Sequence, residues 1–412
     1  MHEEIDVVVI GAGQAGLAAS HELGLRGIEH VVLEAESPGS SWAHRWDSFT
    51  LVGPNHLLLL PGAPYEGDDP DGFMSREEIT RHLEEYASRL TAQVRHGAPV
   101  RALRPGRHGG YDLETDDGTV RSRVVVVATG AYQRPNVPPA VAALPSGVAC
   151  LDVSQYRNPA ALPDGQVLVV GSGQSACQIA EELAQAGRDV VMACGRAPWF
   201  PRRAGGRDVF EWLLDTPFFD QRVADLPSPA ARLGANPQIS GRDGGHDLSF
   251  RTLHGLGVRL GGHLVGVDDT SVRLAPDLAS TLAASDAAHD ALRDLVVASC
   301  TRAGRTPPDV PDPGAFDPRP VEGLPVREVG AVVVAAGFRT RYTEWIDVPG
   351  LVDEQGFPFN DDGESTVAPD LHFVGVHFLR KRRSALLFGV GDDASATATR
   401  IAGRLGLTAR PA

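Results

Sequence analysis

A glycine motif that occurs twice, each time between an apolar run and a helical stretch, constrains this chain most strongly. The first copy, residues 11–16 (GAGQAG), follows the apolar run 7–10 (VVVI). The second copy, residues 171–176 (GSGQSA), follows 167–170 (VLVV). Continuous apolar runs of this length predict strands buried on both faces, as in a parallel sheet. We therefore expect an α/β fold with two Rossmann-like dinucleotide-binding domains.

The first motif has a physical reason for each glycine. Gly11 makes the tight turn, Gly13 lets a pyrophosphate approach the backbone, and Gly16 lets the helix pack on the strand. The amino terminus of the following helix stabilises phosphate charge. Glu34 ends the next apolar run and can accept hydrogen bonds from a ribose diol. This unit is expected to hold a resident dinucleotide, either FAD or NAD.

The second motif differs from the first at the end of the following strand, the position that selects between NADH and NADPH. Its next strand ends at Cys194, Gly195 and Arg196, with no carboxylate. An arginine there suits a 2′-phosphate, which a carboxylate would repel, so this copy predicts NADPH rather than NADH. Arg202, Arg203 and Arg207 follow closely and are further candidates for that phosphate site. Two dinucleotide sites on one chain indicate electron transfer from a diffusible nicotinamide to a resident cofactor.

Proline-rich segments divide the chain. One spans residues 135–163 and the other 307–325. They predict a first domain in two parts, 1–163 and 326–412, with a second dinucleotide domain, 164–325, inserted between them. The last part is expected to carry a strand at 371–376 and a closing helix near 393–405.

Composition excludes several classes of protein. The net charge is −15, from 38 basic and 53 acidic residues, so nucleic acids and anionic membranes are poor partners. No apolar stretch approaches the ~18 residues of a membrane span, and the acidic amino terminus is no signal peptide. The 4 cysteines include no CxxC pair and the histidines have no metal-ligand spacing. We expect a cytoplasmic protein without a metal site.

Several segments together resemble one known superfamily. Residues 39–47 (GSSWAHRWD) look like a Gly-Gly-x-Trp stretch beside a flavin, and 51–55 (LVGPN) like a segment whose Asn lies near the flavin's reactive edge. Residues 128–130 and 336–338 look like hinges between domains. The chain thus resembles the flavin-containing monooxygenase superfamily, the single-component flavoenzymes that use NADPH, and within it a bacterial branch of flavoprotein oxidoreductases.

Two further segments resemble the same branch. Residues 201–208 resemble the arginine-rich loop of its NADPH domain, and 382–394 the segment that closes over the flavin. The first domain is then the FAD domain and the inserted one the NADPH domain. The motifs and the resemblance together make these the expected cofactor-binding residues: Gly11, Gly13, Gln14, Ala15, Gly16, Glu34, Ala35, Ser41, Trp42, Arg45, Val100, Ala128, Thr129, Gly130, Gly171, Gly173, Gln174, Ser175, Arg196, Arg203, Ala336, Gly337, Leu386 and Leu387.

The resemblance also implies a reaction. NADPH reduces FAD, O2 forms a C4a-(hydro)peroxyflavin, and one oxygen passes to the nitrogen, sulfur or carbonyl of a small molecule. Asn55 is the candidate for a polar catalytic group near the flavin. A homodimer is compatible with the family.

Two departures from the superfamily pattern keep other functions open. Asp152 stands where the fingerprint between the two motifs has a histidine, although the aromatic Tyr156 is kept. The second hinge has Ala336 where the pattern has threonine. An NADPH-dependent flavoprotein reductase or oxidase and a non-catalytic nucleotide-sensing protein are therefore the alternatives to a monooxygenase.

Overall fold

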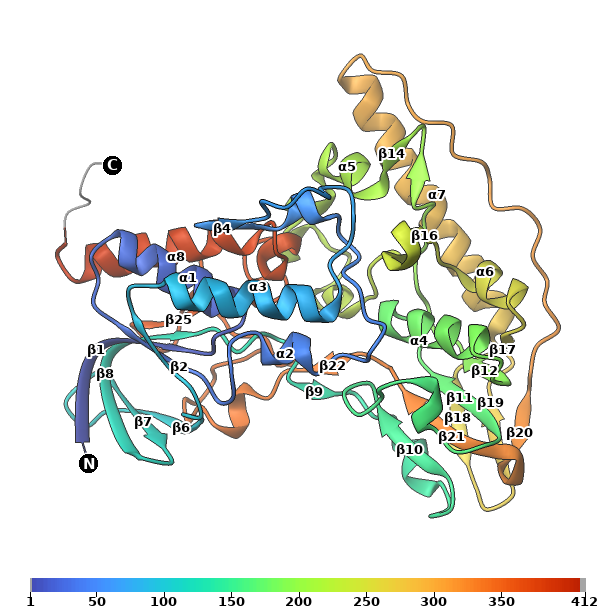
Figure 1. Ribbon diagram of the computed structural model, residues 1–412, viewed down its shortest axis with the longest axis horizontal. Coiled ribbons are helices and arrows are strands. Elements are labelled where there is room, and N and C mark those ends of the chain that lie inside the picture. The colour runs from blue at the N-terminus through green and yellow to red at the C-terminus, as the bar shows by residue number, and fades with distance from the viewer. Residues whose placement is uncertain (1, 408–412) are drawn as a thin grey trace.

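Two parallel sheets, one behind each glycine motif, organise the residues that the computed structural model describes, 2–407. The first sheet lies in the left-hand part of Figure 1 and the second in the right-hand part; we call these parts the first lobe and the second lobe. Each glycine motif connects a parallel strand to a helix, as in a dinucleotide-binding fold. The predicted α/β class with two Rossmann-like domains is confirmed.

The first sheet has its parallel strands in the order β5-β2-β1-β8-β25, extended by β24 and β23 and by a hairpin, β6-β7, that pairs with β8. At its centre Val7 pairs with Val124 and Ile10 with Val127, and all four are buried. The strands are β1 (His2–Ile10), β2 (Val31–Leu33), β5 (Gln93–Arg95), β6 (Val100–Pro105), β7 (Tyr111–Thr115), β8 (Gly118–Val127), β23 (Asn360–Asp361), β24 (Glu364–Ser365) and β25 (Leu371–Phe373).

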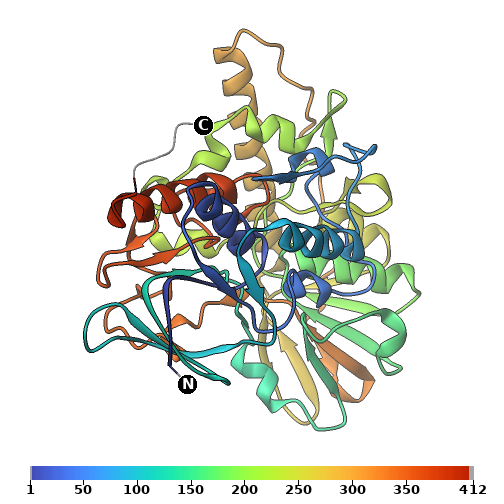
Figure 2. The same cartoon turned by 60° about the vertical axis from the view of Figure 1, so that its left-hand side comes forward.

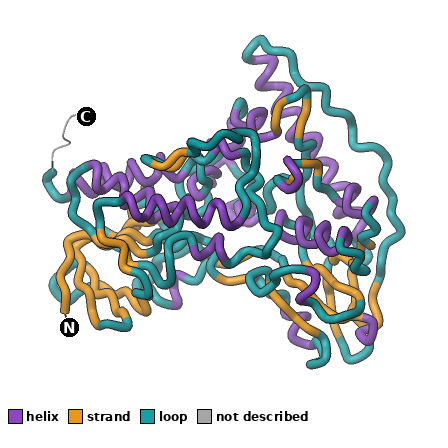
Figure 3. Tube along the Cα trace, viewed as in Figure 1, coloured by secondary structure: helices purple, strands orange, loops and turns teal. Residues whose placement is uncertain are grey.

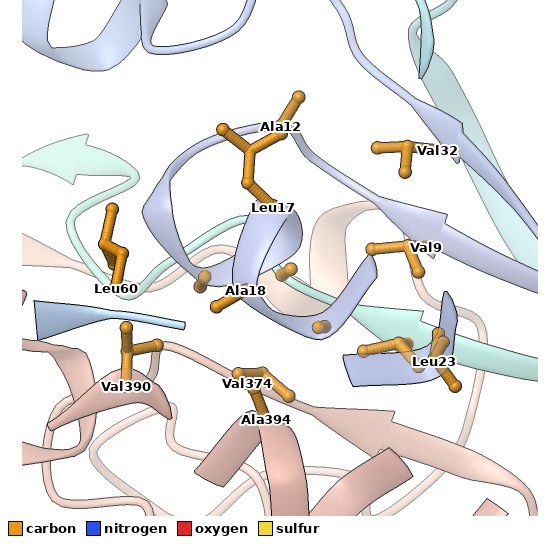
Figure 4. Packing of buried hydrophobic residues seen from close by; sticks show 14 of the residues in the cluster. Val9, Ala12, Leu17, Ala18, Leu23, Val32, Leu60, Val374, Val390 and Ala394 are labelled. Carbon is orange, nitrogen blue, oxygen red and sulfur yellow. The ribbon is translucent and has the colours of Figure 1, made fainter. Parts of the chain in front are cut away.

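Three helices form the layer beside this sheet: α1 (Gln14–Leu25), α3 (Arg76–Arg89) and α8 (Val390–Arg404). Figure 4 shows Leu17 and Leu23 of α1 packed with Val9 of the sheet and with Val390 and Ala394 near α8's amino end. Helix α1, which follows the first glycine loop, therefore packs against both the sheet and helix α8. Helix α8 is the predicted closing helix, and it begins three residues earlier than the expected 393.

The second sheet is wholly parallel, in the order β10-β21-β11-β12-β17. Its strands are β10 (Ala149–Asp152), β11 (Gln166–Val170), β12 (Val190–Ala193), β17 (Arg259–Gly261) and β21 (Val329–Val334). Helices α4 (Gln174–Gln185) and α6 (Phe250–Gly255) pack in the core on one face. The antiparallel strands β18 (Leu264–Val267), β19 (Ser271–Leu274) and β20 (Gly323–Pro325) pack in the core on the other.

A long helix, α7 (Leu278–Arg302), runs past the second sheet. Its first turn packs in the sheet's core through Leu278 and Leu282, whereas Leu292 and Val296 lie in a separate aromatic cluster with Phe200 and Trp212. The irregular chain after α7, drawn in teal in Figure 3, returns to β20. Among residues 2–407 no helix, α7 included, is long and apolar enough to span a membrane.

Short elements connect the lobes. Strands β9 (Arg134–Pro135) and β22 (Phe338–Arg339) pair antiparallel where the chain passes from one lobe to the other and back. Smaller elements lie outside the two sheets: α2 (Ser40–Ala43), α5 (Val209–Leu214), β3 (Leu59–Leu60), β4 (Ala63–Pro64), β13 (Arg203–Ala204), β14 (Arg207–Asp208), β15 (Ile239–Ser240) and β16 (His246–Asp247).

The strand pairing corrects the expected domain boundaries at 163/164 and 325/326. Strand β10 lies before residue 164 and β21 after residue 325, yet both pair in the second sheet. Figure 2 shows orange strand, late in the chain, beside the green strands of that sheet. The sequence prediction was wrong because proline content marked the ends of irregular segments rather than the crossings between lobes. Those crossings are β9 and β22, so the second lobe extends from near residue 136 to near residue 337.

Candidate functional site

The two glycine motifs form matching loops at the carboxyl ends of β1 and β11. Gly11 has φ +102° and Gly171 has φ +125°, values that favour glycine. A Cβ atom on Gly11 would lie 2.9 Å from the carbonyl oxygen of Ala128, and one on Gly171 would lie 2.3 Å from that of Ala335. Each loop is therefore packed directly against the residue that follows a neighbouring strand. One hinge segment begins at Ala128 and the other directly after Ala335, so each hinge lies beside one loop.

The two motifs differ at their sixth residue, which is Gly16 in the first motif and Ala176 in the second. A Cβ atom on Gly16 would lie 1.8 Å from the carbonyl oxygen of Gly11, so no side chain fits there. The second loop accommodates Ala176, whose side chain is fully buried. The glycine-to-alanine difference is thus a difference in helix packing and leaves the approach to the loop unchanged.

Both loops leave an open approach to a helix amino terminus. Gly13 and Gly173 are the N-cap residues of α1 and α4, and neither helix has a side-chain cap. A Cβ atom built on either glycine meets nothing within 4 Å. Free backbone N–H groups in an open cradle fit the pyrophosphate of a dinucleotide. Both loops therefore suit the FAD and NADPH that the sequence predicts.

Glu34 lies directly beside the first loop. Its two carboxylate oxygens accept hydrogen bonds from the backbone N–H of Ala12 at 2.6 Å and of Glu36 at 2.9 Å. The backbone N–H of Ala98 donates to the Glu34 carbonyl at 2.8 Å, which brings the start of β6 at Val100 to the same edge. A buried carboxylate held in this way has further lone pairs for ribose hydroxyls. The neighbouring Ala35 is exposed.

Arg196 lies beside the second loop. The backbone N–H of Gly195 donates to Ser172 Oγ at 2.7 Å, which fixes the chain just before Arg196 against the loop. The Arg196 side chain is exposed, and within residues 2–407 it forms no ion pair. Gln174 and Ser175, at the start of α4, are half-buried in the same loop. Arg196 is therefore free to meet a phosphate.

The other three arginines of this region are engaged elsewhere. Arg203 donates to the carbonyl oxygens of Gly245 at 3.1 Å and Gly244 at 3.0 Å. Arg207 pairs with Glu211 and with Asp215, each at 3.0 Å. Arg202 is almost wholly buried and pairs with Asp208. The three arginines that we named as further candidates for the phosphate site therefore all have protein partners, whereas Arg196 forms no ion pair among the described residues.

A seam of contacts connects the first loop to the segments expected beside the flavin. Trp42 Nε1 donates to Gln14 Oε1 at 3.1 Å, and Gln14 Nε2 donates to the carbonyl oxygen of Ala385 at 3.3 Å. The half-buried Leu386 and Leu387 follow, and Leu387 packs against the first lobe's core. Ala15, next to Gln14, is buried, whereas Ser41 is exposed. Residues far apart in the sequence therefore meet at the loop.

The hinge residues lie where the two lobes join. Thr129 Oγ1 and the Gly130 carbonyl oxygen both accept from Gln133 Nε2 at 2.8 Å. In the other hinge, the carbonyl oxygens of Ala336 and Gly337 accept from Asn136 at 3.1 and 2.8 Å. The backbone carbonyl therefore supplies the contact at Ala336, where the family pattern has a threonine hydroxyl.

Asn55 is buried and its amide bonds to the backbone. Its Nδ2 donates to the carbonyl oxygen of Asp69 at 2.9 Å, and its Oδ1 accepts from the N–H of Met74 at 2.8 Å. These bonds clamp residues 51–55, which we call the flavin-edge segment, to residues 69–74. The geometry supports a structural role for Asn55 more directly than the expected catalytic one.

Arg45 is half-buried at the junction of the lobes. Its guanidinium lies 5.8 Å from the ring centroid of Phe338, and its Nε is buried without a hydrogen-bond partner. Burial lowers the pKa of Arg45 from its ordinary value, and Tyr132 opposes that shift. An arginine with unused donors suits the negative charge of a cofactor, as we expected for this residue.

Trp46 is a joint between the lobes that the sequence did not identify. It belongs to the first-lobe segment 39–47, yet its buried ring packs in the core of the second lobe with Val153 and Tyr156. The neighbouring Asp47 accepts from Asn158 Nδ2 at 2.7 Å. The sequence signal was a second tryptophan, after Trp42, in a segment of mostly polar residues.

The fingerprint segment around Asp152 has a structural role. Asp152 Oδ1 accepts from the backbone N–H of Ser154 at 2.8 Å, which closes the turn after β10. Tyr156 OH donates to Glu182 of α4 at 2.8 Å. Burial beside that carboxylate raises the pKa of Tyr156 above its ordinary value. Within residues 2–407 no group of His, Cys, Asp or Glu side chains is arranged to hold a metal ion.

Comparisons with known proteins agree with this geometry. Residues 8–223 match the model of the family described as pyridine nucleotide-disulphide oxidoreductase. A Geobacillus kaustophilus protein, "Uncharacterized oxidoreductase CzcO-like", is 28% identical over 396 residues, which are 96% of this chain and 97% of that protein. The rice indole-3-pyruvate monooxygenase YUCCA1 is 32% identical over 184 residues, 44% of this chain and 45% of that one.

A solved structure agrees as well. The flavin-containing monooxygenase from Stenotrophomonas maltophilia superposes with a TM-score of 0.69 at 20% identity, covering 98% of this chain and 99% of that one. Its likeness confirms the fold. The chain therefore belongs to the pyridine nucleotide-disulphide oxidoreductase family.

Proposed function

We propose that this oxidoreductase is an FAD- and NADPH-dependent monooxygenase that transfers one oxygen atom of O2 to a small molecule. The observation that carries the proposal is the pair of open helix amino termini, at Gly13 in the first lobe and Gly173 in the second lobe of one chain. One loop has a carboxylate beside it, Glu34, and the other a free arginine, Arg196. This difference in charge suits a resident FAD at the first loop and a diffusible NADPH at the second.

The protein's part in the reaction is to bind, orient and exclude water. When bound, NADPH supplies a hydride and FAD accepts it and reacts with O2. The amino terminus of α1 holds the FAD pyrophosphate and Glu34 accepts from its ribose. Arg196 binds the 2′-phosphate of NADPH. Trp42, Leu386 and Leu387 place apolar surface next to the first loop, where a dry environment limits the loss of oxygen as hydrogen peroxide.

Two buried cysteines, Cys177 and Cys194, are poorly suited to pass electrons to a disulfide. Burial raises the pKa of Cys194 to about 12 and also raises the pKa of Cys177 well above its ordinary value. A disulfide-reducing enzyme needs a thiolate, which burial disfavours at both positions. The names of the rice YUCCA1 relative and the S. maltophilia neighbour support a monooxygenase by analogy. A cytoplasmic location and a homodimer stay predictions.

An NADPH-dependent flavoprotein reductase or oxidase is the second candidate. Asp152, which replaces the fingerprint histidine and closes a turn, is the observation that favours it. A nucleotide sensor without catalysis fits less well, because the seam around Trp42 and Gln14 would then have no cofactor ring to contact.

Isotope labelling tests the proposal. The purified holoprotein is given NADPH, ¹⁸O2 and one representative each of the thioethers, tertiary amines and ketones. The expected result is a product with one ¹⁸O atom for each NADPH consumed in at least one class. Recovery of all electrons as hydrogen peroxide with every class would favour the oxidase, and failure of NADPH to reduce the flavin would favour the sensor. Glu34→Gln, which replaces one accepting oxygen by a donor, serves as the low-flavin control.

A further inference from the structure

Arg202 is a buried cation at the boundary between the lobes. It follows β12 in the chain and belongs to the second lobe, where its guanidinium pairs with Asp208 at 2.7 Å. Only 1% of its side chain is exposed. Its backbone N–H donates to Asp247 Oδ1 at 2.6 Å. Removing an arginine's charge from water is costly. An arginine is therefore seldom buried so completely unless it holds other groups in place.

The same guanidinium contacts the first lobe. Its Nη1 donates to the carbonyl oxygen of Val52 at 2.7 Å, in the flavin-edge segment. Its Cζ lies 4.3 Å from the ring centroid of Phe73, within the segment that Asn55 clamps to the flavin-edge segment. Arg202 therefore holds the flavin-edge segment from the side of the NADPH lobe.

Asp208 extends this connection to helix α5. Its Oδ1 accepts from the N–H of Phe210 at 2.9 Å and so caps the helix, while its Oδ2 faces Arg202. A Cβ atom built on Gly53 would lie 3.8 Å from Phe210 Cζ. The two partners of the ion pair thus act on adjacent residues of the flavin-edge segment. Arg202 donates a hydrogen bond to Val52, and Asp208 holds the helix whose Phe210 ring lies beside Gly53.

We propose that Arg202 is a positioning residue that sets the NADPH lobe against the flavin-edge segment, and thereby sets the distance between nicotinamide and flavin. This inference rests on the proposed use of FAD and NADPH in one chain. Hydride transfer is sensitive to such placement, because an error of about 1 Å in the reacting geometry can cost about 100-fold in rate. The pyrophosphate loops and Arg196 are separate from these contacts, so the affinities for both nucleotides should not depend on Arg202.

Arg202→Gln tests the proposal by anaerobic rapid mixing with NADPH. The expected result is a rate of flavin reduction at saturating NADPH that falls about 10- to 100-fold, with an NADPH dissociation constant within about twofold of wild type. Arg202→Lys, which keeps one donor for the Val52 carbonyl, should recover part of the rate. Arg188→Gln is the matched control, since the Arg188 side chain donates to the carbonyl oxygens of Pro159 at 2.9 Å and Leu162 at 3.2 Å in its own lobe, and it should leave the rate unchanged.

A second variant covers a failure to fold. Arg202→Gln leaves the Asp208 carboxylate without its cation, which alone can destabilise the protein. Arg202→Met/Asp208→Asn removes both charges and keeps a side-chain oxygen to cap α5. We expect this double variant to fold and to reduce its flavin as slowly as Arg202→Gln, because the donor to the Val52 carbonyl is lost in both.

Hydrogen–deuterium exchange supplies a readout apart from activity. The peptide that contains residues 51–55 should exchange faster in Arg202→Gln and in the double variant than in wild type. In Arg188→Gln it should exchange at the wild-type rate. Reduction rates within twofold of wild type in a folded Arg202 variant would overturn the proposal, as would an equal loss of rate in Arg188→Gln. Because reduction is followed without O2, the outcome does not depend on whether oxygen is later inserted. Failure of NADPH to reduce the wild-type flavin would instead count against the proposed function.

Discussion

At the scale of single residues, two side chains of opposite charge distinguish two loops that are otherwise alike. Glu34 is held by two backbone N–H groups beside the first loop, while Arg196 stands exposed beside the second. A carboxylate accepts from ribose hydroxyls, and a guanidinium matches a phosphate. One substitution at each position therefore probes one cofactor.

Arg196→Ala should raise the dissociation constant for NADPH about 10- to 100-fold, because a charge-assisted bond to the 2′-phosphate is worth roughly 1.5–3 kcal/mol. The constant for NADH should change less than about twofold. Fluorescence titration of the holoprotein with each nucleotide measures both constants. Equal losses for NADPH and NADH would contradict the assignment of Arg196 to the 2′-phosphate.

His377 makes stability depend on pH. Burial lowers its pKa to about 4, and the positive charges of Arg382 and Arg232 add to the shift. In the unfolded chain its pKa is about 6.5. Between these values the unfolded state binds more protons, so the unfolding free energy falls as pH drops from about 6.5 to about 4, by about 3 kcal/mol.

Thermal melts of His377→Gln from pH 7.5 to 4.5 test this. The variant should lose less stability on acidification than wild type does. His372, whose pKa burial also lowers to about 4, should keep part of the acid sensitivity in the variant. A variant whose melting temperature falls as steeply as that of wild type would show that His377 is not the group responsible.

At the scale of elements, each strand–loop–helix unit has one glycine packed against the protein and another that faces open space. In the second loop, Gly171 faces a carbonyl oxygen, whereas Gly173 faces open space. The local motif predicted which glycine makes the tight turn and which leaves the backbone open, because both follow from the geometry of one turn. The sequence also placed α8 within a few residues.

Gly173→Ala should therefore fold with an unchanged melting temperature and bind NADPH at least about 10-fold more weakly, because its Cβ fills the approach to the helix amino terminus. Gly171→Ala should lower the unfolding free energy by about 2 kcal/mol or more, through strain at positive φ and a clash with Ala335. Melting curves and NADPH titrations of both variants check the pair. Loss of stability in Gly173→Ala would show that this glycine has a folding role.

At the scale of the whole molecule, the lobes are joined by residues that no local pattern revealed. Trp46 packs in the opposite lobe, Arg202 reaches across to Val52, and β21 pairs with β11. Each of these contacts joins segments that are far apart in the sequence. Periodicity and motif spacing cannot predict them, because both describe only residues that are close together in the chain. The fold class and the nucleotide loops were therefore predictable from the sequence, whereas the domain boundaries and the joints between lobes were not.

Trp46→Ala should lower the unfolding free energy by about 3–5 kcal/mol, because it removes a large buried side chain and leaves a cavity between the lobes. Leu25→Ala, at an apolar side chain that is 66% exposed, is the control and should change it by less than about 0.5 kcal/mol. Denaturant unfolding measures both. If Trp46→Ala lowered the unfolding free energy no more than Leu25→Ala does, Trp46 would not be a joint between the lobes.

The central claim is that both cofactors serve oxygen transfer, and one rapid-mixing experiment tests it most directly. The holoprotein is reduced by NADPH without oxygen and then mixed with oxygenated buffer, while flavin absorbance and hydrogen peroxide are followed. The account predicts a return of the oxidised-flavin spectrum in two phases, the second lasting seconds or longer while NADP⁺ is bound, and hastened by a substrate. A single rapid return with one hydrogen peroxide per flavin, with or without substrate, would contradict it.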